Sequence, residues 1–265
     1  MTTVHPTAIV DDGASLGSDV TVGPFCVIGP DVVVSDGVTF ESHVAVDGHT
    51  EIGAGCHIYP FASLGHNPQD LKYSGEESRL IIGENTTIRE NVTMNPGTEG
   101  GGLVTRVGSQ CLLMVGAHIA HDCQLGNNVI MVNYSSLGGH VTIADNAIFG
   151  GNSAAHQFTR IGELAFVGGM TGVENDVIPF GMVTGNRASL SGLNLVGLKR
   201  AGVARDDIHA LRRAYKMLFA EGGTLASRTD QVAEEYDGHN MVGKIIDFIR
   251  AGKDRGITVP DQAGG

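Results

Sequence analysis

The sequence predicts a mainly β protein, a parallel β-helix of hexapeptide repeats followed by a C-terminal α-helical domain. An aliphatic or aromatic residue occupies every sixth position from Val4 to Leu64, returns at Ile82, and recurs without a break from Val107 to Val173. Glycine often follows this residue, and beyond Val173 the repeat decays into helical spacing. A period of six over so many cycles fits neither an α-helix nor simple strand alternation. It is typical of a hexapeptide solenoid.

The repeat also predicts how the coils stack. Three hexads make one triangular coil, so we expect residue n to lie beneath residue n + 18, about 4.8 Å away, at the strand spacing of a sheet. We expect this β-helix over residues 1–190, with insertions looped out near 66–80 and 95–106 where the repeat lapses. The first insertion is polar and charged, and the second is glycine-rich. Insertions in a solenoid usually line its binding surface.

The remaining residues, 191–265, are expected to form the helical domain. Apolar residues at helical spacing predict one helix from about Arg205, marked by Ile208, Leu211 and Leu218. Further apolar positions between Val232 and Ile249 predict two more helices. Such a block would cover the open end of the solenoid, whose unpaired strand edges otherwise invite aggregation.

Composition excludes several classes of protein. A formal net charge of −12 argues against general nucleic-acid binding, which needs a basic surface. The N-terminus has no apolar run flanked by positive charge, and no apolar stretch is long enough to span a membrane. We therefore expect a cytoplasmic protein without stable membrane insertion. The four cysteines each fall four residues after a repeat position, in a slot that otherwise holds small residues, so we interpret them as core packing.

Histidines supply the candidate chemistry. Four of them fall in consecutive coils of the second half of the solenoid: His118, His121, His140 and His156. Stacking by one coil puts Asp122 over His140 and His121 over Gly139. An imidazole with a pKa near 6.5 removes a proton from a hydroxyl, and a bare glycine N–H stabilises an oxyanion. This equipment predicts direct acyl transfer to an alcohol, without a Cys or Ser relay.

Several motifs make the chain resemble the UDP-N-acetylglucosamine O-acyltransferase family over its whole length. The motifs are AHIAHDC (117–123), QDLKY (69–73), GGH (138–140), HQF (156–158) and GNR…NLVGLKR (185–200). The resemblance implies the cytoplasmic enzyme that opens lipid A synthesis in Gram-negative bacteria. It implies a homotrimer of left-handed parallel β-helices with active sites in clefts between subunits. An (R)-3-hydroxyacyl group would pass from acyl carrier protein to the 3-hydroxyl of UDP-N-acetylglucosamine, without metal, cofactor or covalent intermediate.

The resemblance also implies roles for individual residues. His121 would be the general base, Asp122 would support it, and the Gly139 amide would face the thioester oxygen. Gly169 would act as the ruler for acyl length, and a glycine there leaves room for a long donor of the hydroxymyristoyl class. The sugar and pantetheine would meet His118, His140, His156 and Gln157. The nucleotide sugar would meet Gln69, Asp70 and Lys72, and its uridine or phosphates would meet Asn194 and Arg200.

Two segments depart from the family pattern. Common members have His-Arg-Gly-Thr where this chain has the run 95–98, Asn-Pro-Gly-Thr, and Ala201 replaces a second basic residue after Arg200. Both departures affect the expected nucleotide contacts. A separate feature is a local net charge of +4, because six basic residues stand against Asp206 and Asp207: Lys199, Arg200, Arg205, Arg212, Arg213 and Lys216. This cluster predicts a dock for the acidic carrier protein.

Alternatives remain open from the residues alone. Some relatives prefer an acceptor with a 3-amino group. The N-acyltransferase that acts later in the same pathway shares the solenoid, but it normally has an N-terminal uridine-binding domain, whereas the hexads here start at Val4. A CoA-dependent hexapeptide transferase is a further alternative. In a different class, a zinc-dependent hexapeptide-fold carbonic anhydrase would use histidines such as His118 and His121 as ligands.

Overall fold

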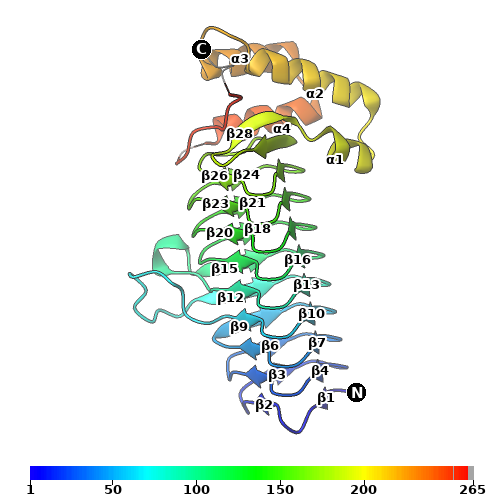
Figure 1. Cartoon of the computed structure of the whole chain (residues 1–265), viewed down its shortest axis with the longest axis vertical. Helices are drawn as coiled ribbons and strands as arrows, with labels where there is room; N and C mark the ends of the chain where they lie inside the picture. The colour runs from blue at the N-terminus through cyan, green and yellow to red at the C-terminus, as the bar shows by residue number, and fades with distance from the viewer. Residues whose placement is uncertain (253, 262–265) are drawn as a thin grey trace.

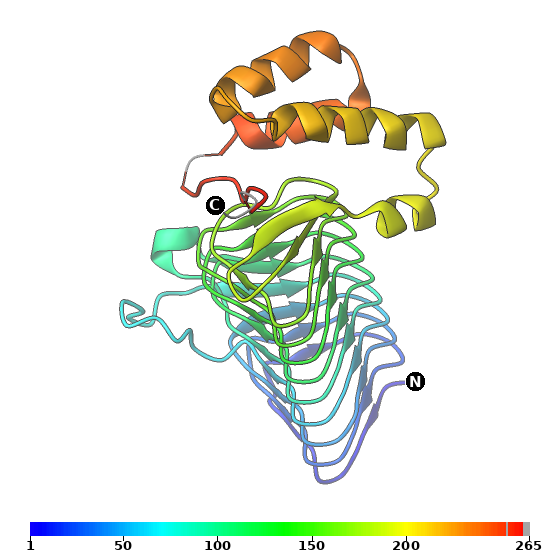
Figure 2. The same ribbon diagram turned by 45° about the horizontal axis from the view of Figure 1, so that its top comes forward.

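The computed structural model describes residues 1–252 and 254–261. These residues form a long triangular prism of parallel strands, with helices gathered at its C-terminal end (Figure 1). Each coil contributes one short strand to each of three sheets, and the section is triangular when the prism is tilted (Figure 2). The predicted hexapeptide solenoid is confirmed.

The strands are grouped by sheet, and the sheets are numbered in the order in which the chain visits them. The first sheet holds β1 (Thr3–Val4), β4 (Thr21–Val22), β7 (Thr39–Phe40), β10 (His57–Ile58), β13 (Thr87–Ile88), β16 (Leu112–Leu113), β19 (Ile130–Met131), β22 (Ile148–Phe149), β25 (Phe166–Val167), β27 (Gly181–Thr184) and β28 (Ser189–Leu193). The second sheet holds β2 (Ile9–Val10), β5 (Val27–Ile28), β8 (Ala45–Val46), β11 (Ser63–Leu64), β14 (Thr93–Met94), β17 (His118–Ile119), β20 (Ser136–Leu137), β23 (Ala154–Ala155) and β26 (Gly172–Val173). The third sheet holds β3 (Ser15–Leu16), β6 (Val33–Val34), β9 (His49–Ile52), β12 (Arg79–Ile82), β15 (Val104–Val107), β18 (Gln124–Leu125), β21 (Thr142–Ile143) and β24 (Arg160–Ile161).

Three edges separate the sheets. We call them the 1–2 edge, the 2–3 edge and the 3–1 edge, after the sheets that the chain leaves and enters. Stacked residues are 18 apart, as predicted: Thr3 pairs with Thr21 and His118 with Ser136. The insertions interrupt this register, because Ser63 pairs with Thr93 instead.

Both insertions leave the prism at the 2–3 edge, between β11 and β12 and between β14 and β15, and they project from it on one side (Figure 1). The second insertion includes the short 3-10 helix η1 (Glu99–Gly101). The predicted ends of the insertions, at residues 80 and 106, need correction. The strands resume earlier, at Arg79 and Val104, because Leu80 and Thr105 already turn inward and are buried.

The core of the prism is the repeat itself. Residues at the sixth positions are buried from Val22 onward, whereas Val4 is 43% exposed because no coil lies beneath it. The four cysteines are buried and unbridged, which confirms their interpretation as core packing. Burial raises the pKa of Cys56 to about 11 and that of Cys123 to about 12. Such thiols are poor nucleophiles at neutral pH.

The C-terminal end is closed by a hairpin, four helices and a returning segment within the described residues. β27 pairs with β28 in antiparallel fashion, the one such pair among the strands. The helices are α1 (Leu195–Arg200), α2 (Arg205–Leu218), α3 (Leu225–Glu235) and α4 (Asn240–Arg250). The last three were predicted; α1 and the hairpin were not, because the six-residue α1 is too short to show a period. The chain then returns to the last coil, where Ile257 pairs with Asp176.

Arg160 joins α4 to the prism, because its guanidinium pairs with the buried Asp176 and also donates to the Phe248 carbonyl of α4 at 3.0 Å. Asp176 is 1% exposed and accepts hydrogen bonds from the Arg160 backbone N–H at 2.8 Å and from its Nε at 2.7 Å. The Arg160 guanidinium lies 4.2 Å from the centre of the Phe248 ring of α4.

Within the described part of the chain, no helix combines the length and the apolar character needed to cross a lipid bilayer.

Candidate active site

Two of the four predicted histidines, His121 and His140, meet at the 2–3 edge, beside both insertions. His121 and Asp122 occupy the turn after β17, and His140 occupies the turn one coil further on, where its N–H donates to the His121 carbonyl at 3.0 Å. The two imidazole rings meet edge to face with centroids 5.0 Å apart. Phe158, from the next coil, stacks on His140 at 4.3 Å. One-coil stacking thus brings these side chains together as predicted.

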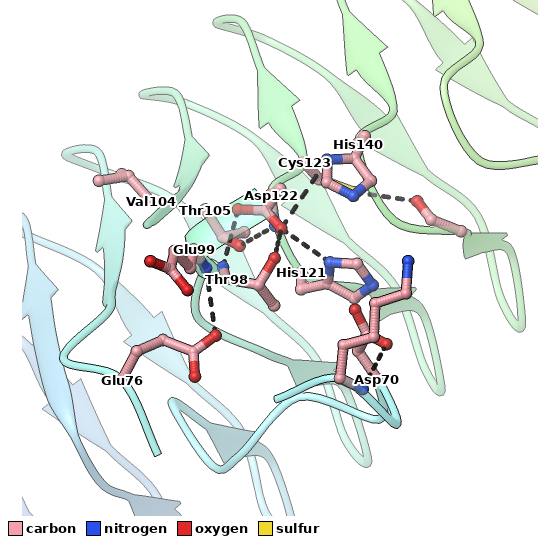
Figure 3. Close-up of polar contacts among 12 residues, drawn as sticks. Asp70, Glu76, Thr98, Glu99, Val104, Thr105, His121, Asp122, Cys123 and His140 are labelled. Atoms are coloured by element: carbon pink, nitrogen blue, oxygen red, sulfur yellow. Dashed lines mark hydrogen bonds and ion pairs between the residues drawn. The ribbon is translucent and has the colours of Figure 1, made fainter. Parts of the chain in front are cut away.

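A left-handed turn aims Asp122 at His121. Adjacent residues of a strand point to opposite faces, but Asp122 has φ = 61°, so the chain turns at this residue and both side chains meet. The carboxylate Oδ2 lies 2.8 Å from Nδ1 of His121, and the Asp122 side chain is fully buried (Figure 3). Since an ionised carboxylate only accepts hydrogen bonds, Nδ1 carries the proton. The lone pair of the imidazole is therefore on Nε2, where a general base needs it.

Gly139 packs directly against the His121 ring. A Cβ placed on Gly139 would lie 2.5 Å from Nε2 and 2.4 Å from Cε1, so only glycine leaves space for the imidazole. Among the described residues, the Gly139 N–H has no hydrogen-bond partner. At the 3–1 edge the equivalent N–H groups of Ser18 and Asn127 are capped by Asp36 and Asp145, each at 2.7 Å. The bare Gly139 amide is thus free to bind an oxyanion next to the base.

Two further imidazoles surround His121. Nδ1 of His118, on β17, lies 2.7 Å from the Thr93 hydroxyl. Burial, with a contribution from nearby His121, lowers the pKa of His118. Burial also lowers the pKa of His140, reinforced by His121 and Lys72 and opposed by Asp122 and Asp70. Both rings are therefore neutral at pH 7, and each can offer an N–H to a polar ligand.

The first insertion contributes charged groups to the same edge. Asp70 and Lys72 influence the pKa of His140 in opposite directions, and the Lys72 backbone N–H donates to the Asp70 carboxylate at 3.0 Å. Gln69 is exposed in the same loop. His156 and Gln157 are exposed one coil beyond His140, where Arg255 donates hydrogen bonds to Nδ1 of His156 and to the Gln157 carbonyl. Arg255 was not predicted from the sequence.

The departure at Asn95 has a structural role. Its side-chain amide donates to the carbonyl groups of His66 at 3.0 Å and Asn67 at 3.2 Å, so it ties the two insertions together. Asn95 is only 7% exposed. The insertions therefore behave as one unit over the 2–3 edge.

Three predicted residues lie away from the 2–3 edge. Asn194 caps α1 by accepting from the Gly197 N–H at 2.9 Å, and it donates to the Leu164 carbonyl at 2.9 Å. With Arg200 it lines a groove of about 560 Å³ over the first sheet, floored by Ile130, Ile148, Phe166 and Met182. This sheet is the face opposite the 2–3 edge. Gly169 lies at the 1–2 edge, between β25 and β26. Within one chain, these residues do not join His121.

Comparison with known proteins decides the family. A curated acyl-[acyl-carrier-protein]–UDP-N-acetylglucosamine O-acyltransferase of Sinorhizobium fredii is 49% identical over 261 residues, covering 98% of this chain and 97% of the relative. One of Rhizobium johnstonii is 49% identical over 259 residues, covering 98% and 95%. The chain belongs to the UDP-N-acetylglucosamine O-acyltransferase family. It is an acyltransferase, as predicted.

Structures and domains agree with this family. LpxA from Acinetobacter baumannii matches with a TM-score of 0.93 at 41% identity, covering 96% of this chain and 99% of that one. The UDP-N-acetylglucosamine acyltransferase of Francisella novicida matches at 0.95 and 34% identity, covering 98% and 95%. The match confirms that the β-helix is left-handed. Residues 176–258 match the family described as UDP N-acetylglucosamine O-acyltransferase, domain 2.

Membership of the acyltransferase family overturns the carbonic anhydrase alternative. The geometry points the same way. His121, Asp122 and His140 offer ligand atoms within 4.8 Å of one another, but Oδ2 of Asp122 already binds Nδ1 of His121. His118, the other expected zinc ligand, has its Nδ1 within 2.7 Å of the Thr93 hydroxyl, so this nitrogen already has a hydrogen-bond partner.

Proposed function

We propose that this chain transfers an (R)-3-hydroxyacyl group from acyl carrier protein to the 3-hydroxyl of UDP-N-acetylglucosamine, the first step of lipid A synthesis. The names of the curated relatives include acyl carrier protein and UDP-N-acetylglucosamine. The single observation that carries the proposal is the pairing of His121 with Asp122 beside the bare Gly139 amide. This arrangement supplies a base and an oxyanion donor side by side.

The proposed mechanism is a direct transfer. Nε2 of His121 takes the proton of the sugar 3-hydroxyl while that oxygen attacks the thioester carbonyl. The Gly139 N–H stabilises the oxyanion of the tetrahedral intermediate. When this intermediate collapses, the C–S bond breaks and the thiolate of the carrier takes the proton from the His121 imidazolium. No cofactor or covalent enzyme intermediate is required.

We further propose that the protein is a homotrimer whose active sites lie between subunits. Asn194, Arg200 and Gly169 would meet the nucleotide and acyl chain only if a second copy brings its first sheet or its 1–2 edge to His121. The separation of these residues from the 2–3 edge in one chain supports that arrangement. His118, His140, His156 and Gln157 would meet the sugar and pantetheine, and Gln69, Asp70 and Lys72 the nucleotide sugar. We also propose a cytoplasmic location and two domains, 1–190 and 191–265, a division that the start of α1 at Leu195 supports.

A comparison of two acyl donors distinguishes this proposal from the CoA-dependent alternative. Purified enzyme is incubated with UDP-N-acetylglucosamine and with the same hydroxyacyl group carried either by acyl carrier protein or by CoA. We expect rapid acyl transfer from the carrier protein and little from CoA at equal concentration. Equal or faster transfer from CoA would contradict the carrier-dependent function.

Replacement of Gly169 by methionine should shift the enzyme toward shorter donors. A Cβ on Gly169 would touch only the Gly151 carbonyl, at an ordinary 3.4 Å, so the chain itself accepts a larger residue. A side chain there would instead fill the acyl slot. Because each excluded methylene is worth about tenfold or more, kcat/KM for the hydroxymyristoyl donor should fall by at least about tenfold relative to shorter donors.

The matched control is Gly243→Met, in α4, where an added Cβ meets nothing within 4 Å. It should leave the preference for donor length unchanged. The measurement is kcat/KM for a series of hydroxyacyl carrier thioesters. An unchanged order of preference in Gly169→Met would overturn the ruler assignment.

Charge reversal in the basic cluster should weaken carrier docking. A groove between α1 and α2 is lined by Lys199, Arg205 and Arg212, whereas Nε of Arg213 donates to the Tyr236 hydroxyl at 3.3 Å. We expect Arg205→Glu combined with Arg212→Glu to raise KM for the carrier-bound donor about tenfold at low salt, because like charges repel the acidic carrier. Arg213→Glu should have a smaller effect. If KM rises only for UDP-N-acetylglucosamine, the docking assignment is wrong.

A further inference from the structure

The Asp122 carboxylate is buried and closely surrounded. Its side chain is 0% exposed, so the ionised form needs hydrogen-bond donors in place of water. His121 supplies one donor to Oδ2 through Nδ1 at 2.8 Å. Nδ1 of His140 lies further away, 3.8 Å from the same oxygen. The remaining donors to the carboxylate come from a single residue of the second insertion.

That residue is Thr98. Its backbone N–H donates to Oδ1 of Asp122 at 2.8 Å, and its hydroxyl donates to Oδ2 at 2.6 Å (Figure 3). Thr98 thereby holds both carboxylate oxygens of Asp122. Thr98 is itself 5% exposed, so water does not replace these contacts. Hydrogen bonds to an ionised group are shorter and stronger than neutral ones, which fits the 2.6 Å distance.

The second insertion is built to hold Thr98 in this position. The Thr98 carbonyl accepts from the N–H groups of Gly101 at 3.0 Å and Leu103 at 2.9 Å, which closes the loop on itself. The next residue, Glu99, donates its N–H to Glu76 of the first insertion at 3.1 Å. Gly101 lies so close to the carboxylate that a Cβ there would be 2.0 Å from Cγ of Asp122. The loop therefore fits over Asp122 closely.

We propose that Thr98 is a positioning residue, which holds the ionised Asp122 carboxylate against Nδ1 of His121 and so keeps Nε2 aimed at the acceptor hydroxyl. This inference rests on the proposed function of His121. Without the hydroxyl, Oδ2 loses its shortest hydrogen bond, and the carboxylate is free to rotate toward His140. The base then spends less time in the productive orientation. A loss of positioning affects the chemical step rather than substrate binding.

The test is the variant Thr98→Val, which keeps the shape and the backbone N–H but removes the hydroxyl. We expect kcat to fall about 10- to 100-fold, in line with one hydrogen bond to a charged group, with KM for UDP-N-acetylglucosamine nearly unchanged. Thr98→Ser restores the hydroxyl and should recover kcat to within a few fold. The matched control is Thr86→Val, whose buried hydroxyl donates to the Gly108 carbonyl at 3.0 Å at the 3–1 edge. It should keep the wild-type kcat.

A second measurement is independent of activity. In the folded protein, the His121 Nδ1 proton shared with Asp122 should give a low-field proton NMR resonance, which Thr98→Val shifts or broadens and Thr86→Val leaves in place. An unchanged kcat and resonance in Thr98→Val, or a Thr98→Ser variant as impaired as Thr98→Val, overturns the inference. If the wild-type enzyme does not use the carrier-bound donor but the resonance still responds to Thr98, the proposed function fails and the positioning role stands.

Discussion

The variant His121→Ala should lose about 10²- to 10⁴-fold in kcat, because it removes the base that deprotonates the acceptor. The His121 ring is held by Asp122 at 2.8 Å and packs closely on Gly139, so the position of the base is fixed. His140 cannot substitute fully, since its Nδ1 is 3.8 Å from Asp122. The measurement is the rate at which the carrier thiol is released in the presence of UDP-N-acetylglucosamine.

Loss of activity must be separated from loss of folding. The His121 side chain is 13% exposed at a corner of the prism rather than inside the core, so the solenoid should form without it. Circular dichroism and thermal unfolding should therefore show a folded variant, destabilised by the loss of one donor to a buried carboxylate. A folded His121→Ala enzyme with kcat within tenfold of wild type would exclude His121 as the base.

The second large effect is expected for Gly139→Ala. The added methyl would lie 2.4 Å from the His121 ring, so the imidazole must move by about 1 Å, a displacement that costs on the order of 10²-fold in rate. Crowding of the oxyanion site would add to this loss, since removing one oxyanion donor costs about 10²- to 10³-fold. We expect kcat to fall by at least 10²-fold, with KM for UDP-N-acetylglucosamine changed far less.

A matched variant is Gly151→Ala at the 1–2 edge, where a Cβ would meet the Asn133 carbonyl at an ordinary 3.4 Å. It should keep the wild-type kcat, because the change lies at another edge of the prism than His121. Steady-state kinetics on both variants, with thermal unfolding as a check on folding, gives the comparison. Near-normal kcat in Gly139→Ala would show that neither the tight ring packing nor the glycine amide matters to the chemical step.

The hexapeptide period predicted much of the site, because it fixes which residues share an edge. Stacking by 18 residues predicts that His121 lies over Gly139 and Asp122 over His140, and the hydrogen bond from the His140 N–H to the His121 carbonyl confirms this stacking. The turn that brings Asp122 to His121 was less predictable. Left-handed conformations occur at residue types as different as Phe25 and Asp122, so sequence alone does not mark them.

The contacts of the insertions could not be predicted in this way, because the insertions have no sequence period. Thr98 was visible in the sequence only as part of a family motif, and nothing in its spacing indicated that it meets Asp122 across 24 positions of the chain. The position of Arg255 on His156 depends on the path of the returning C-terminal segment, which pairs at Ile257 with the last coil. Long-range contacts of loops depend on packing rather than on local pattern.

The predicted site residues are divided between two faces of the chain, and the sequence did not show this division either. The family resemblance grouped Asn194 and Arg200 with the histidines, but resemblance carries no information on which subunit supplies each residue. The structure of one chain places them over the first sheet, opposite His121. This is the geometry expected of a site shared between copies, and it makes the oligomeric state part of the proposed chemistry.

Mass spectrometry of the acylated nucleotide sugar tests the central claim most directly. The enzyme and its His121→Ala variant are each given UDP-N-acetylglucosamine, its 3-amino analogue and a mixed pool of hydroxyacyl carrier thioesters. We predict that the wild-type enzyme forms one main product, UDP-N-acetylglucosamine bearing a long 3-hydroxyacyl chain on its 3-oxygen, and that the folded variant forms almost none. The same product in similar yield from His121→Ala, or acylation of the 3-amino sugar alone, would contradict the claim.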